Sequence, residues 1–120
     1  MRSQNERPVQ SIGDAVDVLG SYRRRLVLSI LSGRSGSIDV SQLATRLVAR
    51  QRNKSSAAVT DEERRETEIR LYHADLPLLA AADLVRFDAS RAHVESADLP
   101  LDGDDWLDMP VAEALSAWNQ

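Results

Sequence analysis

Apolar residues recur at helical spacing over most of the chain, which predicts a fold made mainly of amphipathic helices. Three early segments each place their apolar residues on one side of a helix: Ile12, Ala15, Val18 and Leu19; then Leu26, Val27, Ile30 and Leu31; then Val40, Leu43, Ala44, Leu47 and Val48. Ser21 and Asp39 stand where helix N-caps stand, and Gly33 stands where a helix ends. We therefore expect three helices before residue 52.

A longer helix is predicted from about Asp61 to about Ala82, because Thr60 and Glu63 have the spacing of a capping box. Its expected buried face consists of Ile69, Tyr72, Leu76, Leu79 and Ala80. Pro77 removes one helical hydrogen bond, so we expect a kink or a brief break beside it. Leu71 and Leu78 fall on the opposite side of a straight helix. Either the kink brings them inside or they mark a subunit interface.

Two short strands follow the long helix. "DLVRFD" and "RAHVES" alternate in the manner of a β-hairpin around the tight turn "DAS", and Ser37 with Ile38 would be a further short strand. Near the end of the chain, Asp108 is placed to cap a last helix after the loop-like stretch "ADLPLDGDDW". That helix would present Val111, Leu115 and Trp118 either to its own domain or to a second copy. The resulting order predicts a mostly α fold with a small β-hairpin wing, a winged helix-turn-helix.

The predicted organisation has three parts: a disordered N-terminal tail over residues 1–10, a winged-helix domain over 11–96, and an acidic tail with an amphipathic helix over 97–120. Charge differs sharply along the chain. Residues 1–60 hold ten Arg/Lys and four Asp/Glu, a balance of +6, whereas residues 61–120 hold five and fifteen, a balance of −10. Such asymmetry indicates a charged partner surface on one half or a solvating acidic tail on the other.

The composition disfavours several classes of protein. With no cysteine there is no disulfide framework and no thiolate metal site. A metal site would need His73 and His93 with carboxylates, and no nucleophile elbow or glycine-rich phosphate loop is present. No secretory signal and no membrane-length apolar run are found, so we expect a cytoplasmic protein without catalysis, metal, cofactor or small-molecule substrate.

Several basic residues are candidates for DNA contact. Arg23 and Arg24 would meet phosphates near a helix N-terminus, or else lie against neighbouring acids. The long helix offers Arg64, Arg65, Thr67, Arg70 and His73, and of these Arg64, Thr67, Arg70 and His73 are the candidates. The exposed face of that helix would enter the major groove, or else carry solvated pairs such as Glu66 with Arg70. At the hairpin, Arg91 would contact the minor groove or the backbone, or is a plain surface residue of the turn.

The segments "YRRRLVLSIL", "VSQLATRLVA", "TDEERRETEIRLYHADLPLLAAADLVRFD" and "AHVE" resemble a small winged-helix domain common in haloarchaeal proteomes, whose members are mostly uncharacterised predicted regulators. The likeness covers about residues 12–96. The general shape is similar to that of ArsR-type regulators, which carry "LxxAGLV" after the recognition helix. This chain has "LAAADLV", so Asp83 stands where glycine usually lets the chain turn.

The expected function is therefore that of a DNA-binding transcriptional regulator. Its recognition helix would span about residues 61–82 and its wing about 84–96. It would act as a homodimer on double-stranded DNA, with Val111, Leu115 and Trp118 at the interface, because one recognition helix covers only a few base pairs. The alternative is a protein-interaction module that has the winged-helix shape and does not bind DNA.

Overall fold

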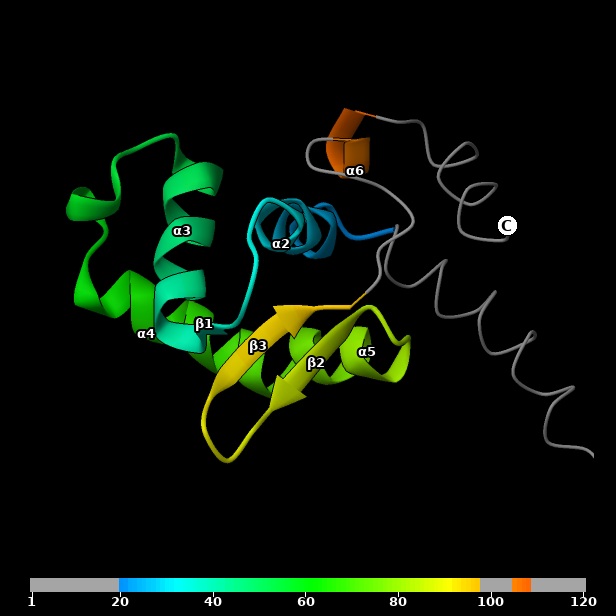
Figure 1. Cartoon of the computed structure of the whole chain (residues 1–120). Helices are drawn as coiled ribbons and strands as arrows, with labels where there is room; N and C mark the ends of the chain where they lie inside the picture. The colour runs from blue at the N-terminus through cyan, green and yellow to red at the C-terminus, as the bar shows by residue number, and fades with distance from the viewer. Residues whose placement is uncertain (1–19, 98–104, 109–120) are drawn as a thin grey trace, which may run out of the picture.

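Helices make up most of the chain that this computed structural model describes, namely residues 20–97 and 105–108. They are α2 (Tyr22–Ser32), α3 (Val40–Arg52), the 3₁₀ turn η1 (Ser56–Ala58), α4 (Asp61–Arg70), the π-helical turn η2 (Leu71–Asp75), α5 (Leu76–Ala81) and α6 (Asp105–Asp108). The strands β1 (Ile38–Asp39), β2 (Val85–Asp88) and β3 (His93–Ser96) form one antiparallel sheet in the order β1-β3-β2. The predicted fold class is confirmed: the chain is mostly α with a small β-hairpin wing (Figure 1).

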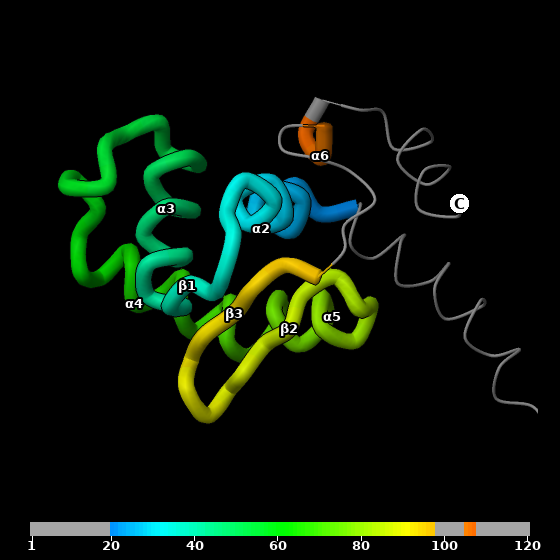
Figure 2. The backbone as a smooth tube through the Cα atoms, viewed as in Figure 1, coloured from blue at the N-terminus to red at the C-terminus, as the bar shows by residue number. Residues whose placement is uncertain are grey.

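The sheet turns its apolar side chains to the helices. Val94 of β3 lies opposite Phe87 of β2 on one side and Ile38 of β1 on the other. Ile38 and Val94 are buried and Phe87 packs against the core, whereas Arg86 and Asp88 are exposed. This alternation is the one expected for a sheet with one solvated face. The hairpin of β2 and β3 therefore covers the core while its tip projects beyond the helices (Figure 2).

Helix α2 forms the centre of the core. All six residues from Leu26 to Leu31 are buried, including Ser29. The helix packs against α3, α6 and β3, so that most of its second half is enclosed. In Figure 1 α2 is seen nearly end-on between α3 and α6. The four apolar residues predicted for one side of this helix are buried, and Leu28 joins them.

The long helix is not continuous, and its predicted buried face is partly wrong. A π turn, η2, separates α4 from α5 just before Pro77, and the amide of Leu76 donates to the carbonyl oxygen of Leu71, five residues earlier. The π turn adds a residue to the helical period, so Leu71 rather than Tyr72 stacks under Leu76. Leu71 is fully buried and Leu78 is partly buried, whereas Ile69 is 55% exposed.

The end of α5 explains why Asp83 can replace a glycine. The amide of Leu84 donates to the carbonyl oxygen of Leu79 at 3.0 Å, and the amide of Asp83 donates to that of Ala80 at 3.0 Å. This closing pattern requires a left-handed residue, and Asp83 adopts it with a φ of 63°. Aspartate tolerates this conformation better than most residues other than glycine, so the helix ends at Ala81 as the pattern predicts.

Most of the predicted caps are confirmed. The Ser21 side chain accepts from the amide of Arg24, Gly33 closes α2, and Thr60 with Glu63 forms the capping box of α4. Asp39 occupies the N-cap position of α3, but its side chain makes no capping hydrogen bond there. The first backbone amide of α3, that of Val40, instead donates to the carbonyl oxygen of Ala92 in the hairpin turn.

Some predictions lie outside the described residues: the N-terminal tail, the helix with Ile12 and Val18, and the last helix with Val111, Leu115 and Trp118. The prediction of a loop up to Trp106 is wrong at its end, because Asp105–Asp108 is helical. Trp106 is 1% exposed and belongs to the core cluster. Burying so large an aromatic ring against α2 joins this short helix to the winged-helix domain.

Candidate nucleic-acid interface

The exposed face of α4 carries both acidic and basic side chains, and some of the acidic ones are paired with nearby cations of the same protein. The Oε1 of Glu63 accepts a hydrogen bond from the Nζ of Lys54 at 2.7 Å, and its Oε2 lies 3.4 Å from the Nη1 of Arg52 in α3. Its carboxylate also accepts from the amide of Thr60, at 2.9 Å. The hydrogen bond from Lys54, followed by that from the Thr60 amide, lowers the pKa of Glu63 to about 2. Glu63 therefore stays charged but is matched by two cations.

Arg64 turns away from the candidate interface. Its Nε lies 3.0 Å from Glu68, one helical turn later, and its Nη1 lies 3.2 Å from Asp61. The Arg64 side chain is 28% exposed, because it lies along the helix surface between these two acids. The sequence prediction of a DNA contact at Arg64 is therefore not supported by its position. Thr67 is half-buried, so it does not point fully outward as predicted.

Arg65 and Arg70 are the open cations of α4. Both are exposed, and neither forms an ion pair with any of the residues that the structure describes. The Glu66–Arg70 pair that the spacing allows is not formed between them. The exposed guanidinium groups of Arg65 and Arg70 have the donors that guanine and phosphate groups accept. Both are among the residues that the sequence offers on this helix, and Arg70 is the one it selects for a base contact.

Tyr72 joins the helix to the wing. Its ring meets the His73 ring at a centroid distance of 5.2 Å and the Phe87 ring of β2 at 5.3 Å. Its hydroxyl donates to the carbonyl oxygen of Ala89 in the hairpin turn. These contacts fix the wing relative to η2, so His73, which is exposed, lies on the side of the helix that faces the wing. Tyr72 was predicted as a buried residue and is instead half-buried with this polar link.

The wing turn is shaped by Asp88. One of its carboxylate oxygens accepts from the amide and hydroxyl of Ser90, at 3.1 and 2.7 Å, and from the amide of Arg91 at 3.2 Å. The Ser90 hydroxyl is the main cause of a lowered pKa at Asp88. Ala92 then takes a positive φ of 54°. The side chain of Arg91 is 79% exposed and lies 3.8 Å from Asp88, so this pair is loose and the guanidinium is open to a ligand.

His93 connects the wing to the start of α3. Its Nε2 lies 2.8 Å from a carboxylate oxygen of Asp39. Asp39 is the N-cap residue of α3, but its side chain makes no capping hydrogen bond there. The two residues are also backbone partners in the sheet. Together with the bond between Val40 and Ala92, this contact brings the first turn of α3 beside the wing turn. Helix, wing and α3 therefore contribute to one surface.

A groove lies where these three elements meet. It has a volume of about 500 Å³ and is lined by Asp39, Val40, Ser41, Glu68, Ile69, Tyr72, His73 and Ala92. Ile69, whose side chain is 55% exposed, adds apolar surface to this groove. Arg91 stands in the turn that borders the groove. This helix–wing face is the candidate interface.

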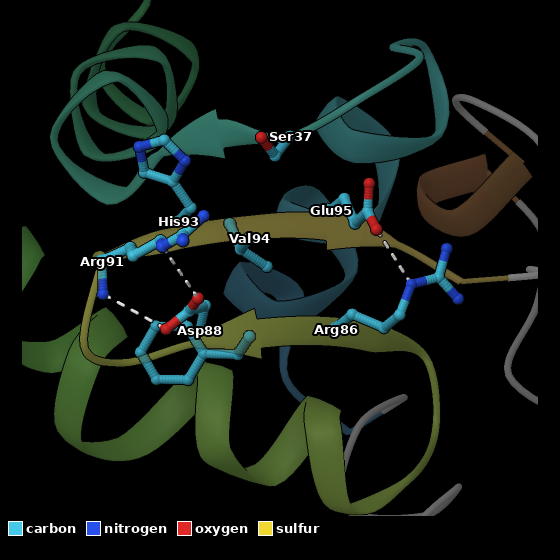
Figure 3. A pocket seen from close by; sticks show the side chains of 8 residues that line it. Ser37, Arg86, Asp88, Arg91, His93, Val94 and Glu95 are labelled. Carbon is cyan, nitrogen blue, oxygen red and sulfur yellow. Dashed lines mark hydrogen bonds and ion pairs between the residues drawn. The ribbon is translucent and has the colours of Figure 1, made fainter.

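The outer face of the sheet offers much less. Figure 3 shows Arg86 reaching Glu95 across the two strands, with an Nε to carboxylate distance of 2.9 Å, and Arg91 beside Asp88. A shallow hollow of about 300 Å³ is lined by these residues with Ser37, Phe87, His93 and Val94. Arg86 and Glu95 match each other's charge across the strands, whereas the pair of Arg91 with Asp88 is loose, so Arg91 is the cation that this face leaves open.

Arg23 and Arg24 do not lie at the interface. The Nη2 of Arg23 lies 2.6 Å from Asp75, and the Nε of Arg24 lies 3.2 Å from the other oxygen of the same carboxylate. Asp75 is fully buried in η2, so the two arginines neutralise a charge inside the fold. Of the two interpretations that the sequence allowed, the position against a neighbouring acid is the one found, and a phosphate contact by this pair is not supported.

Within residues 20–97 and 105–108, no group of histidine and acidic residues has the arrangement of a metal site. No helix in the same residues is both long and apolar enough to cross a bilayer. The proposed dimer residues Val111, Leu115 and Trp118 lie beyond the described part.

Comparison with known families gives one match. The model of a domain of unknown function, DUF7344, matches residues 16–95. The chain belongs to the DUF7344 family. The match runs from before α2 to the last but one residue of β3, so the DUF7344 domain coincides with the winged helix, and α6 with Trp106 lies outside it. No curated protein and no solved structure matches the chain.

Proposed function

We propose that this protein binds double-stranded DNA as a transcriptional regulator and carries out no catalysis. One observation supports this most: Arg65 and Arg70 on α4 and Arg91 on the wing are exposed, and among the described residues the ion pair found for them is the loose 3.8 Å contact of Arg91 with Asp88. In winged-helix proteins, a recognition helix enters the major groove and the wing reaches the backbone or the minor groove. The proposal assigns Arg70 to a base edge, Arg65 and Arg91 to phosphates, and His73 to the boundary between them.

The acidic side chains of α4 would repel phosphates and so count against this proposal, but some of them are already paired with cations. Glu63 and Glu68 are matched by cations, while Asp61, Glu62 and Glu66 are exposed. Exposed like charges weaken phosphate binding mainly over a distance of about 10 Å at moderate salt, and salt shortens that distance. We therefore expect close contacts by the three arginines to decide the affinity. The proposal needs no cofactor and places the protein in the cytoplasm with its DNA.

A dimer belongs to the same proposal. One recognition helix covers only a few base pairs, and two copies would place two helices about 34 Å apart, one turn of the duplex. Val111, Leu115 and Trp118 remain the residues predicted to form the dimer interface. Light scattering on the intact chain tests it, and a monomeric mass at micromolar concentration would exclude it.

A second candidate function is supported by Ile69. An isoleucine that is 55% exposed, next to the half-buried Tyr72 in a groove of about 500 Å³, also suits an apolar side chain of a partner protein. The winged helix would then be a protein-interaction module without DNA. In a DNA complex the same isoleucine would instead contact a thymine methyl group.

One experiment separates the two functions. The intact chain is used to select from a pool of random duplexes at several salt concentrations, and the bound sequences are determined. Enrichment of a common sequence supports the regulator. Retention without enrichment, or no retention at low salt, leaves the interaction module as the better proposal.

A further inference from the structure

The groove between α4, the start of α3 and the wing turn has apolar walls (Figure 1). Val40, Tyr72 and Ala92 line it, and so does Ile69, whose side chain is 55% exposed. Apolar residues exposed singly are common on protein surfaces and need no ligand to explain them. Ile69 differs from these because it shares a groove of about 500 Å³, and pockets that bind ligands have volumes of about 300–1,000 Å³.

The walls of this helix–wing groove are held in place by contacts within the protein. The hydroxyl of Tyr72 donates to the carbonyl oxygen of Ala89 in the wing turn. The amide of Val40 donates to the carbonyl oxygen of Ala92 at 2.9 Å, which joins the start of α3 to the same turn. A groove whose walls are already ordered binds a partner at a smaller entropic cost. The groove is therefore preorganised for a side chain that enters it.

The side of α4 that carries Ile69 also carries two acidic residues. Glu66 and Glu62 precede Ile69 by three and seven residues, and positions at these spacings lie on one side of an α-helix. Both carboxylates are exposed, and neither forms an ion pair with a residue in the described part of the chain. Arg65 lies four residues before Ile69 on the same side, and the two acids outnumber it. This side of α4 therefore attracts cations rather than phosphates.

The two acids that line the groove itself already have partners. Glu68 lies 3.0 Å from the Nε of Arg64, and Asp39 lies 2.8 Å from the Nε2 of His93. The groove therefore offers a ligand mainly its apolar walls, and the attraction of cations comes from the exposed acids beside it. A ligand that matches both features has an apolar side chain for the groove and a basic residue close to it.

We infer that the helix–wing groove binds a segment of a partner protein in which an apolar side chain is flanked by lysine or arginine. This inference rests on the second candidate function and names the chemistry of its partner. The partner's apolar side chain would cover Ile69, and its basic residues would pair with Glu62 and Glu66. These three residues extend over about two turns of α4, which suits an amphipathic helix lying along it. The acids that count against DNA binding are then the groups that attract the partner.

The probe is a fluorescently labelled helical peptide with leucines along one side and lysines beside them, titrated with the intact chain and followed by anisotropy. We expect this peptide to bind, whereas analogues with serine for leucine or glutamate for lysine should not. Ile69→Ala should weaken binding by about tenfold, the effect of removing part of a buried side chain. Tyr22→Ala is the matched control, since Tyr22 is also 55% exposed but lies on α2, outside the groove. Its affinity should stay within about twofold of the wild type.

A second pair of variants tests the contribution of charge. Glu66→Gln should weaken binding by about threefold at low salt, the effect of one exposed ion pair, and added salt should reduce this difference. Asp105→Asn is the control, because it removes the same charge from an exposed acid on α6, outside the groove. Its affinity should stay close to that of the wild type. Circular dichroism of all four variants shows whether they fold.

Three results would overturn the inference. The first is no binding of the leucine–lysine peptide at low salt. The second is an equal loss for Ile69→Ala and Tyr22→Ala, or for Glu66→Gln and Asp105→Asn, which would mean unspecific attraction. The third is a loss of DNA affinity in Ile69→Ala with peptide binding unchanged, which would assign the groove to DNA. The titration contains no DNA, so an enriched sequence in the duplex selection and a peptide that does not bind would overturn this inference and support the regulator.

Discussion

The Nη2 of Arg23 lies 2.6 Å from the Oδ2 of Asp75, a carboxylate that is fully enclosed by the fold. Arg24 holds the other oxygen of that group, at 3.2 Å. The contact joins the first turn of α2 to the π turn that separates α4 from α5. A residue run that resembles a phosphate-binding patch in the sequence is in fact the partner of a buried acid.

Asp75→Asn should destabilise the fold, because it removes the charge that two half-buried arginines match. Breaking a buried ion pair from one side costs about 3–5 kcal/mol, and the partial exposure of the arginines reduces this to about 2 kcal/mol. Urea denaturation of both proteins measures the difference. Arg86→Gln is the control, because its pair with Glu95 is exposed and should contribute less than about 1 kcal/mol. Equal effects of the two substitutions would contradict a structural role for Asp75.

The π turn predicts opposite outcomes for two nearby apolar residues. Leu71→Ala should cost about 2–5 kcal/mol, since the side chain is fully buried. Ile69→Ala should cost less than about 1 kcal/mol, since Ile69 is 55% exposed. An uninterrupted α-helix with Ile69 on its buried face would give the reverse order. Denaturation midpoints of the two variants therefore test the helical phase directly.

The sequence predicts the order of elements well because caps and turn residues are local signals. Thr60 with Glu63, Gly33 and Asp83 all mark helix ends that the structure has. Apolar spacing in α2 and α3 likewise predicts their buried residues, since each is a regular helix. Local signals do not show how a π turn rotates the residues before it relative to those after it. For this reason the sequence predicts Ile69 as buried and Leu71 as facing away from the core, and the structure has the reverse.

The candidate site is less predictable, because charges are matched by residues distant in sequence. Nothing near Arg23 in the chain indicates that Asp75, about fifty residues later, takes its charge. In the same way, His93 pairs with the carboxylate of Asp39, which the sequence predicts to cap α3. Only the tertiary packing shows which arginines are open.

The stability of the fold should depend on pH through Glu63. Its pKa is lowered from 4.5 to about 2, first by the hydrogen bond from Lys54 and then by that from the Thr60 amide. A lowered pKa in the folded state means that the carboxylate stabilises the fold fully above about pH 4.5 and loses this contribution as the pH falls towards 2. We expect the wild type to be more stable than Glu63→Gln at pH 6, with the difference shrinking between pH 4.5 and 2.

Lys54→Met supplies the control for this pH dependence, because it removes the main cause of the lowered pKa. In the Lys54→Met protein, adding Glu63→Gln should lower the stability at pH 6 by less than it does in the wild type. As the pH falls, the stability difference between the Lys54→Met protein and the double variant should disappear at a higher pH than the difference between the wild type and Glu63→Gln does. Urea denaturation of the wild type, the two single variants and the double variant at several pH values measures both effects. A stability difference that is unaffected by pH would show that Glu63 acts only as a neutral capping group.

Trp106 should be essential for the stability of the domain even though it lies outside the family match. Its side chain is 1% exposed and packs with the core around α2. Trp106→Ala should cost about 3–5 kcal/mol. A chain ending at Ser96 should lose at least as much, so the tail cannot be removed without exposing apolar surface on α2. Denaturation monitored by tyrosine fluorescence or circular dichroism is suitable for both.

A truncation after Asp108 is the matched control, because it keeps Trp106 and removes only residues 109–120. We expect it to lose much less stability than the Ser96 truncation does, because it keeps Trp106 in the core. The same protein also serves the dimer test, since it lacks Val111, Leu115 and Trp118 but keeps the core. If the Ser96 truncation is as stable as the intact chain, α6 makes no contribution to the fold.

The three open arginines Arg65, Arg70 and Arg91 should affect DNA binding in different ways. Arg70→Ala should weaken binding to the selected sequence by about 1–3 kcal/mol and relax the preference at one base pair, as expected for a guanine contact. Arg91→Ala should weaken binding to all sequences alike and should lower the slope of log affinity against log salt by about one, as expected for a phosphate contact. Arg65→Ala should act like Arg91→Ala.

Arg86→Ala is the control for these three, since Arg86 is exposed on the hairpin but is held by Glu95 on the outer face of the sheet. Its affinity and salt slope should stay at the wild-type values. Fluorescence anisotropy with the selected duplex and a scrambled duplex, at several salt concentrations, gives all four sets of numbers. If Arg86→Ala weakens binding as much as Arg70→Ala does, the attraction comes from total charge and the helix–wing face is not the site of sequence recognition.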